Sequence, residues 1–469
     1  QYAKDRFSYK AVGEKLDCIY REILYLHPLK MNQTELINLG IFGSYNKTSI
    51  GDSAILQGLI AQFKDHFDSL TVFAFDPYDV KASVNLYNIK EKIIFGKPIV
   101  NRDKQNKPLK INSIKDNFKK IIKKNNILSK SIYNFYKSIS LLKSDYKTYY
   151  LNREFWRKIR KEIEKLDLFI IGGGNLIMDL YPTWPIYPLI YTILAKKAKV
   201  PIMFYAVGAG PINSFRAKIY FKIMGYFADF ITTRDVNSTK ELNKLGIKSK
   251  KIVTSVDPAI SINLNRYNFR TRQNSKKIGI SVVPYYDKRY WPNGDEVIYK
   301  EYIRKMVLLI DEIVSHFNQK LIFFSTNFPN DLLVAYDIYE KVGKKEKIFI
   351  VEKRLTVGEI LSNISQCQII LGTRLHSLIL SYIVTTPFLA FGYQPKVQSF
   401  CEKYWSNDFF VPLDEKLNFS VKNVVNKLNT LINKENEYRK KMEIRLPIMK
   451  KEADISKDIA LSLVRNKRS

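Results

Sequence analysis

Cysteine is scarce in this chain of 469 residues, which contains three: Cys18, Cys367 and Cys401. An odd number of cysteines so far apart in sequence excludes a disulfide framework and a four-cysteine zinc site. This cysteine usage fits a reducing compartment, so we predict a cytoplasmic location. Histidine is also rare, with four residues. A histidine that lies beside other polar groups at a strand end is therefore a candidate functional residue.

Long apolar runs are absent as well. The longest, residues 187–195 and 378–384, have about half of the roughly 20 residues that a membrane-spanning helix needs. We therefore expect no transmembrane segment. The first residues, from Gln1 on, lack the basic and then apolar pattern of a secretory signal, so none is predicted.

Acidic residues are few relative to basic ones. The chain has 77 Lys and Arg against 45 Asp and Glu, a formal net charge of +32, and residues 90–165 alone hold 22 basic and 7 acidic residues. Such an excess favours an anionic partner. Two explanations of the basic excess remain open. The first is a compositional bias toward lysine. The second is attraction to an anionic membrane surface, where each basic residue near the bilayer contributes roughly 1 kcal/mol of binding free energy. The sequence contains no nucleic-acid-binding motif, so we predict no nucleic-acid partner.

From residue 36 on, short apolar runs bounded by Gly, Asp or Asn alternate with longer amphipathic stretches. This alternation is typical of parallel sheets with crossover helices, and the chain is too long for one ordinary core. We predict an α/β protein of two domains, residues 1–262 and 263–469, whose strand ends face one cleft. The predicted strands are 37–42, 70–75, 168–171, 202–207, 230–232 and 252–255, then 278–283, 321–325, 348–351, 369–371 and 388–390. The predicted helices are 53–64, 185–198, 214–228 and 238–245, then 296–317, 331–342, 357–362, 375–383, 421–432 and 436–446.

A basic segment interrupts the alternation of the first domain at about residues 77–166. We interpret it as a partly helical insertion, with tyrosine and isoleucine interleaved among the lysines. Apolar residues such as Ile121, Ile122, Ile127 and Leu128 have the spacing of an amphipathic helix that could lie on lipid. The same spacing more commonly belongs to a helix that packs onto its own domain.

The first candidate site lies in SYNKTSIGDSAILQGL, after the first predicted strand. Asp52 is placed to cap the following helix, and Gly51 to form the turn. A strand, a polar loop and a helix N-terminus also form a site for an anion or a sugar hydroxyl. Both interpretations of Gly51 and Asp52 remain open from the sequence.

The second candidate site is LFIIGGGNLIMD, where Gly172, Gly173, Gly174 and Asn175 end an apolar strand. Consecutive glycines allow close backbone approach and expose N–H groups, which suits a phosphate or a sugar. Because the spacing is neither GxGxxG nor GxxxxGK[ST], we predict neither a dinucleotide site nor a P-loop.

Two polar residues end later strands of the same domain. Arg234, in ITTRD, is either one half of a local ion pair or a fork-shaped donor for a phosphate or carboxylate in the cleft. Asp257, in SVDPA, is interpreted as a turn or interdomain residue rather than a catalyst.

The third candidate site is the stretch LGTRLHSLILSYIVTTP together with PFLAFGYQPKVQSF. Arg374 and His376 lie where an apolar strand turns into a helix, and Lys396 begins the helix after the next strand. Two helix N-termini with these three side chains would form a site for a small dianion or trianion.

The chain resembles the polysaccharide pyruvyl transferase family in six successive motifs, GDSAIL, IIGGGNLI, VGAGP, TTRD, DPA and GTRLHSLILSYIVTTPFLAFGYQPK. These motifs cover most of residues 39–403, outside the basic insertion and both ends. The family is similar in architecture to GT-B glycosyltransferases, so the resemblance implies two Rossmann-like domains with the acceptor mainly on the first and the donor mainly on the second. The SYNKTS spacer and the insertion depart from the common family pattern, which leaves the acceptor undetermined.

The resemblance implies transfer of pyruvate from phosphoenolpyruvate to a sugar of a cell-surface polysaccharide or its lipid-linked precursor, giving a pyruvate ketal and phosphate. Arg374 and His376 would bind phosphoenolpyruvate and act in catalysis, and Arg234 would be a further anion ligand. Lys396 and Gly172 to Gly174 match motif positions too. No cofactor and no dedicated metal site are predicted.

Two other functions remain open from the sequence. A GT-B glycosyltransferase would place the same cations on the diphosphate of a nucleotide sugar. A non-catalytic basic protein that binds membranes or glycans is the second alternative. An enzyme acting on lipid-linked oligosaccharide would explain the basic insertion, because anionic lipid would recruit it to the inner face of the membrane.

Overall fold

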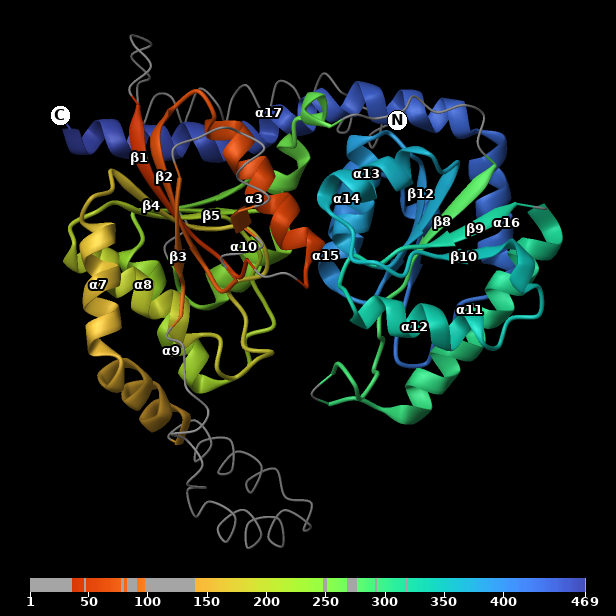
Figure 1. Cartoon of the computed structure of the whole chain (residues 1–469), viewed down its shortest axis with the longest axis horizontal. Coiled ribbons are helices and arrows are strands. Elements are labelled where there is room, and N and C mark those ends of the chain that lie inside the picture. Colours follow the sequence, from red (N-terminus) through yellow and green to blue (C-terminus); the bar gives the residue numbers. More distant parts are fainter. Residues whose placement is uncertain are drawn as a thin grey trace, which may run out of the picture.

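The computed structural model describes residues 36–45, 48–76, 80–81, 91–97, 140–247, 251–267, 276–291, 293–317 and 319–468. These residues form two α/β domains side by side, joined by a helix that runs along both (Figure 1).

The N-terminal domain contains a parallel sheet of seven strands in the order β3-β2-β1-β4-β5-β6-β7. One face packs on α7, α8 and α9, and the other on α3. Both faces are covered, and the strands are accordingly near-continuous apolar runs. The strands are β1 (Ile37–Phe42), β2 (Phe67–Ala74), β3 (Glu91–Phe95), β4 (Leu168–Gly172), β5 (Ile202–Val207), β6 (Phe230–Thr233) and β7 (Ile252–Thr254). The helices are α3 (Ile50–Phe63), α7 (Arg153–Ile163), α8 (Ile186–Lys197), α9 (Phe215–Phe227) and α10 (Val236–Lys244).

The C-terminal domain repeats this architecture with six parallel strands in the order β10-β9-β8-β11-β12-β13. Helices α11, α12 and α16 cover one face, and α13, α14 and α15 the other. The strands are β8 (Lys277–Ser281), β9 (Lys320–Phe323), β10 (Ile348–Ile350), β11 (Ile369–Gly372), β12 (Phe388–Gly392) and β13 (Phe410–Pro412). The helices are α11 (Glu296–Phe317), α12 (Asn330–Tyr339), α13 (Val357–Ser365), α14 (Leu375–Ile383), α15 (Pro395–Tyr404), α16 (Val421–Asn433) and α17 (Glu435–Arg468). The predicted fold of two Rossmann-like domains is confirmed.

Part of the predicted insertion belongs to the core of the N-terminal domain. Residues 91–95 form the edge strand β3, which pairs in parallel with β2. Trp156, Ile159 and Ile163 of α7 are buried in the same core as the strands. The limits 77–166 were therefore too wide. Residues 98–139, with the spacing Ile121 to Leu128, lie outside the described residues.

The last helix continues past the predicted end at residue 446, since Pro447 lies inside it. Met442 and Met449 pack in the core of the C-terminal domain. Ile455 and Ile459 pack against the N-terminal sheet, on the face that α3 covers. Figure 1 shows α17 along the top of both domains. The predicted division at 262/263 separates the two sheets, but it does not describe α17, which belongs to both cores.

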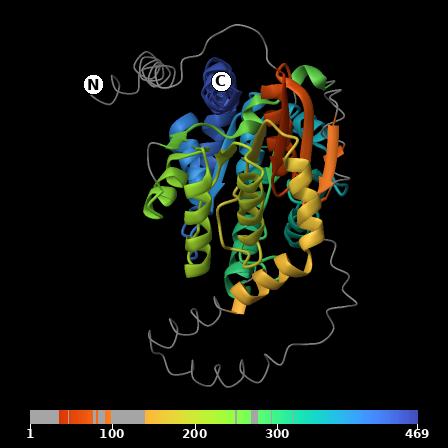
Figure 2. The ribbon, with the colours of Figure 1, turned by 90° about the vertical axis from the view of Figure 1, so that its left-hand side faces the viewer.

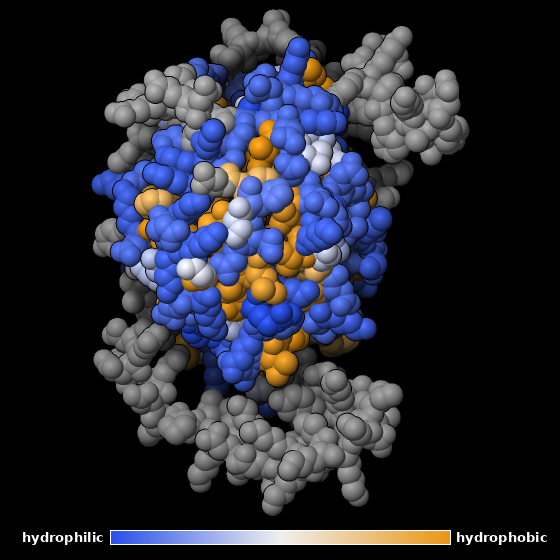
Figure 3. Space-filling model, turned by 90° about the vertical axis from the view of Figure 1, so that its right-hand side faces the viewer, coloured by the Kyte–Doolittle hydropathy of each residue, from blue (hydrophilic) through white to orange (hydrophobic). Residues whose placement is uncertain are grey.

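The face shown in Figure 3 is largely hydrophilic at its edges. On the face of the C-terminal domain that points away from the N-terminal domain, apolar residues form a band between hydrophilic flanks (Figure 3). Among the described helices, none combines the length and the apolar character needed to cross a membrane.

Candidate active site

A cavity of about 570 Å³ lies between the two domains. The carboxyl ends of parallel strands in open α/β sheets form such sites, and the polar residues of this cavity follow β1, β4, β6, β11 and β12. Its polar and charged lining includes Ser44, Asp52, Asn175, Arg234, Asn327, Asn330, Arg374, His376 and Lys396. The structure thus brings residues of all three sequence-predicted sites to one cavity.

The β1–α3 turn places Asp52 differently from the sequence prediction. Ser49, not Asp52, is the N-cap of α3, and its hydroxyl accepts a hydrogen bond from the Asp52 amide at 3.3 Å. The hydroxyl of Ser44 donates to Oδ2 of Asp52 at 3.1 Å. Asp52 therefore lies inside the first turn of the helix, and its carboxyl group is part of the cavity wall.

Burial changes the acidity of the Asp52 carboxyl group. Desolvation raises the pKa of Asp52 to about 6, although His376, Ser44 and Ser49 act in the opposite direction. A carboxyl group with such a pKa changes protonation state near neutral pH and can donate or accept a proton.

Gly51 gives His376 its place in the cavity. A Cβ atom at position 51 would lie 2.1 Å from Nδ1 and 2.6 Å from Cε1 of His376, so the imidazole ring packs directly against the glycine backbone. The predicted role of Gly51 as a turn is wrong, because the residue is helical. Glycine is required here for close approach between two domains.

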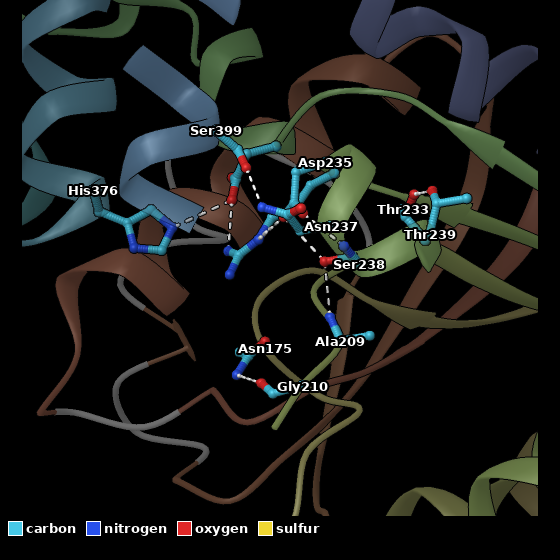
Figure 4. Close-up of polar contacts among 12 residues, drawn as sticks. Asn175, Ala209, Gly210, Thr233, Asp235, Asn237, Ser238, Thr239, His376 and Ser399 are labelled. Atoms are coloured by element: carbon cyan, nitrogen blue, oxygen red, sulfur yellow. Dashed lines mark hydrogen bonds and ion pairs between the residues drawn. The ribbon is translucent and has the colours of Figure 1, made fainter. Parts of the chain in front are cut away.

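Asp257 links His376 to Arg234. Figure 4 shows His376 pointing from the C-terminal domain toward the side of the N-terminal domain that carries Asp235 and Ser238. Oδ2 of Asp257 accepts a hydrogen bond from Nη1 of Arg234 at 3.0 Å and lies 3.5 Å from Nε2 of His376. Burial acts to raise the pKa of Asp257, but the close contact with His376 and the charge of Arg234 outweigh it, so this pKa is lowered. Asp257 is an anion that orients both side chains. The sequence analysis did not predict this role, because it interpreted Asp257 as a turn or interdomain residue.

Arg234 is almost completely buried at the end of β6. One nitrogen binds Asp257, whereas its buried Nε has no hydrogen-bond partner among the described residues. Asp235, 3.8 Å from this Nε, serves instead as the N-cap of α10 and accepts a hydrogen bond from Ser238. The local ion pair considered from the sequence is thus weaker than the pairing with Asp257.

Arg374 is held by a second buried carboxylate. Its Nε and Nη2 donate to both oxygens of Asp331 in α12, at 2.6 to 3.0 Å. Burial opposes the charge of the guanidinium, but Asp331 outweighs it and raises the pKa of Arg374. Asp331 also accepts from the Thr326 and Asn327 amides, at 3.1 and 2.8 Å. This fork-to-fork pairing fixes the guanidinium plane at the cavity wall.

Lys396 lies in the first turn of α15 and lines the same cavity. Burial, together with the charges of Arg234 and Arg374, lowers the pKa of Lys396 to about 7. Within the part of the chain that the structure describes, its ammonium group makes no hydrogen bond or ion pair. A partly buried cation that senses two arginine charges and makes no hydrogen bond to a described residue is suited to binding an anion.

The triple glycine divides into a structural part and a cavity-facing part. Gly172 packs against Ile170 and Leu59, and a side chain at Gly173 would collide with Ile55 at 1.9 Å. Only Gly174 and Asn175 line the cavity, and Asn175 Nδ2 donates to the carbonyl of Gly210 at 2.9 Å. The positive φ angles of Gly173 and Gly174, 72° and 76°, explain why glycine is needed at both.

One wall of the cavity is aromatic, and no motif in the sequence pointed to it. Phe75 makes edge contacts with Trp184 and Tyr187, at centroid distances of 5.4 and 5.1 Å. The Lys97 ammonium lies 5.0 Å from the centre of the Phe75 ring. Flat aromatic faces beside polar groups are suited to sugar rings, which present apolar C–H faces and hydroxyl edges.

A second cavity of about 400 Å³ lies beside the first, between α10 and α15. Arg234, Leu375 and Lys396 line both, so these residues form the wall between them, whereas Asp257 lines the second cavity. Its remaining lining is largely apolar and includes Ile260, Ile379, Phe400, Tyr404 and Met449.

Two doubly wound domains that face a cationic cavity define a GT-B-like architecture. The structure is similar to Alr3699/HepE of Anabaena in complex with UDP-glucose, with 10% identity, a TM-score of 0.55 and coverage of 92% of this chain and 99% of that chain. It is also similar to UDP-GlcNAc 2-epimerase of Neisseria meningitidis bound to UDP-GlcNAc, with 13% identity, a TM-score of 0.52 and coverage of 91% and 99%. At such identities the likeness concerns the fold.

The family follows from the sequence comparison. The family model "Polysaccharide pyruvyl transferase" matches residues 50–395, so this chain belongs to the polysaccharide pyruvyl transferase family. It is 24% identical over 260 residues to the amylovoran biosynthesis protein AmsJ of Erwinia amylovora. That match covers 52% of this chain and 60% of the relative.

Proposed function

We propose that this protein transfers the enolpyruvyl unit of phosphoenolpyruvate to two hydroxyl groups of a sugar, forming a pyruvate ketal and releasing phosphate. The sugar belongs to a cell-surface polysaccharide or its lipid-linked precursor. The observation that supports this most directly is the convergence of Arg234, Arg374, Lys396 and His376 on one cavity. Membership of the pyruvyl transferase family and similarity to a polysaccharide biosynthesis protein support it independently.

The charges of the cavity match this donor. Phosphoenolpyruvate carries a phosphate and a carboxylate, and therefore needs fixed cations at two places. Arg374 is oriented by Asp331, and Arg234 by Asp257, so each guanidinium is fixed before the ligand arrives. Lys396 lines the same cavity and contributes a third charge. The N-termini of α14 and α15, which carry Arg374 and Lys396, add oriented N–H groups.

The reaction needs proton transfer from two sugar hydroxyls and to two acceptors, C3 and the departing phosphate. A proton added to C3 makes C2 electrophilic, one sugar hydroxyl then adds to C2, and a second hydroxyl displaces phosphate. The two hydroxyl protons balance the proton gained by C3 and the proton taken by the departing phosphate. We assign these transfers to His376 and Asp52, which line the same cavity. Acid–base assistance of this kind contributes roughly 10²- to 10⁴-fold to rate.

The first experiment measures ligand selectivity by thermal unfolding. Phosphoenolpyruvate should raise the midpoint temperature of the full chain, whereas UDP-glucose and UDP-GlcNAc should not. The reverse result would assign the cavity to a nucleotide sugar. Binding of neither, together with tight binding to polyanions, would favour a non-catalytic protein.

The second experiment measures phosphate release from phosphoenolpyruvate with a panel of hexose acceptors, followed by NMR analysis of the product linkage. His376→Ala and Arg374→Ala should each lower phosphate release by roughly 10²- to 10⁴-fold, to a small residual rate. Arg304→Ala is the matched control, because Arg304 is exposed on α11 and pairs with Glu301 of the same helix. Near-normal release by either cavity variant would refute the assignment.

A further inference from the structure

Exposed aromatic side chains gather on one helix at the end of the N-terminal domain. Residues 140–151 are helical and directly precede α7. Tyr146, Tyr150 and Leu151 of this helix are 67%, 51% and 76% exposed, and Phe215 at the start of α9 is 60% exposed. Leu142, Tyr146 and Tyr150 are four residues apart and therefore form one stripe. We name Leu142, Tyr146 and Tyr150 the aromatic stripe, and the exposed Leu151 follows at the end of the same helix.

The other side of the 140–151 helix is the side that packs on the domain. Asp145 is buried, forms an ion pair with Arg216 of α9, and accepts a hydrogen bond from Tyr220 at 2.8 Å. Tyr149 packs against the core of the N-terminal domain. The helix is therefore anchored with its aromatic stripe outward. The helix already packs on the domain through Asp145 and Tyr149, so the exposure of the stripe does not result from a missing neighbour within the domain.

Basic residues surround the stripe. Lys143, Lys147, Arg153 and Arg157 are exposed on this helix and the start of α7, and α9 adds Lys218 and Lys222. The Arg153 guanidinium lies 5.4 Å from the centre of the Tyr150 ring, and Tyr146 stacks on Tyr150 at 5.8 Å. In the described segment 140–161, Asp145 and Glu154 are the acidic residues, and Asp145 is buried. The exposed side of this segment is therefore strongly cationic.

This surface is connected to the cavity. Arg216, the partner of Asp145, also donates to the carbonyl of Pro182, which lies between the cavity residues Tyr181 and Thr183. Asp179 of the same loop accepts hydrogen bonds from the Asn213 and Ser214 amides at the start of α9. Figure 2 shows the 140–151 helix crossing the end of the domain, below α8 and α9. The rim of the cavity and the aromatic stripe thus share one rigid support.

We propose that this surface docks on an anionic phospholipid membrane. Tyrosine and leucine side chains with lysine and arginine around them are the composition of interfacial helices, in which the rings lie at headgroup depth and the cations bind anionic lipid. Docking in this orientation turns the rim of the cavity toward the bilayer. The inference rests on the proposed function: docking would bring the cavity to an acceptor sugar that is attached to lipid.

Vesicle sedimentation with the full-length protein tests the docking. Binding to vesicles of phosphatidylglycerol and phosphatidylcholine should exceed binding to phosphatidylcholine alone, and it should fall as salt rises. Lys143→Gln/Lys147→Gln should weaken the partition coefficient roughly thirtyfold, since each basic residue contributes about fivefold. Tyr146→Ser/Tyr150→Ser should weaken it as well, but with the salt dependence retained. Lys440→Gln/Lys451→Gln on α17, along the opposite edge of the molecule, is the matched control and should change it less than about twofold.

Each other result has a meaning. Equal vesicle binding by the stripe variants and the control variant overturns the proposal. If instead the wild type forms dimers that Tyr146→Ser/Tyr150→Ser dissociates while vesicle binding is unchanged, the surface binds a second copy of the chain. Thermal protection by phosphoenolpyruvate should be retained in every variant, because none of these residues lines the cavity. Loss of vesicle binding with retained protection thus separates this inference from the proposed function.

Discussion

Replacing Gly51 by alanine should disable His376 without unfolding the protein. The added Cβ would lie 2.1 Å from Nδ1, 2.6 Å from Cε1 and 2.7 Å from Cγ of His376. An ordinary contact requires the ring to retreat by roughly 1 Å or more, and a displacement of that size can cost about 100-fold in rate. Any such retreat changes the position of the ring relative to Asp257, whose Oδ2 lies 3.5 Å from Nε2 of His376.

The same substitution should not destabilise the fold. Gly51 is helical, and alanine is favoured over glycine in a helix by up to about 1 kcal/mol. The clash involves the end of a side chain that is 18% exposed and free to turn into the cavity. We therefore expect an unchanged or slightly higher unfolding temperature, with phosphate release from phosphoenolpyruvate reduced about 100-fold.

Two further variants separate this explanation from its rivals. Gly343→Ala is the control, because a Cβ there would meet its nearest atom, Oδ1 of Asp311, at an ordinary 3.6 Å. Gly51→Ala/His376→Ala should be no slower than His376→Ala alone, since both changes remove the same group. A fully active Gly51→Ala, or a double variant much slower than His376→Ala, would refute the reasoning.

Three other predictions concern the charges of the cavity. Burial beside Arg234 and Arg374 lowers the pKa of Lys396 to about 7, and an anion binds its protonated form. Calorimetry should therefore show that affinity for phosphoenolpyruvate falls up to about tenfold per pH unit above pH 7. Lys396→Met should lose this dependence. Asp331→Ala should lower the free energy of unfolding in urea by about 3 to 5 kcal/mol, because it leaves the buried Arg374 unpaired. Asp65→Ala, which removes an exposed ion pair, should lower it by less than about 1 kcal/mol. Burial raises the pKa of Asp52 to about 6, so between about pH 4 and pH 6 the folded state holds a proton that the unfolded chain has lost, and stability falls as pH rises through this window. Asp52→Asn should remove that fall in thermal unfolding and lower phosphate release at pH 7, and a variant with the wild-type pH profile would argue against a role for this carboxyl group.

The sequence predicted most of the sheet because buried parallel strands are short apolar runs. Ile37–Phe42 and Ile202–Val207 were predicted with the bounds that the structure has. The strands it missed, Glu91–Phe95 and Phe410–Pro412, both lie at sheet edges. Edge strands are only half covered, so they can carry charges or end in proline and lose the apolar signature.

The carboxylates of the site were harder to predict than its cations. An aspartate at a turn has the sequence appearance of a helix cap, and Asp257 does accept a hydrogen bond from the amide of Ala259, as a cap does. Its second role becomes visible only beside Arg234 and His376. Asp331 lies 43 residues from Arg374 in the sequence. No local pattern predicts an ion pair between residues so far apart.

The alternation of strands and helices was predictable from the chain, and so were Arg234, Arg374 and His376 at strand ends and Lys396 at a helix start, since these features depend on neighbouring residues. Which groups meet across the cleft was not predictable in this way. Gly51 against His376, Arg234 with Asp257, and Arg374 with Asp331 depend on how two sheets pack and on α17, which joins their cores. Such contacts join residues far apart in the chain, whereas local propensity acts over a few residues.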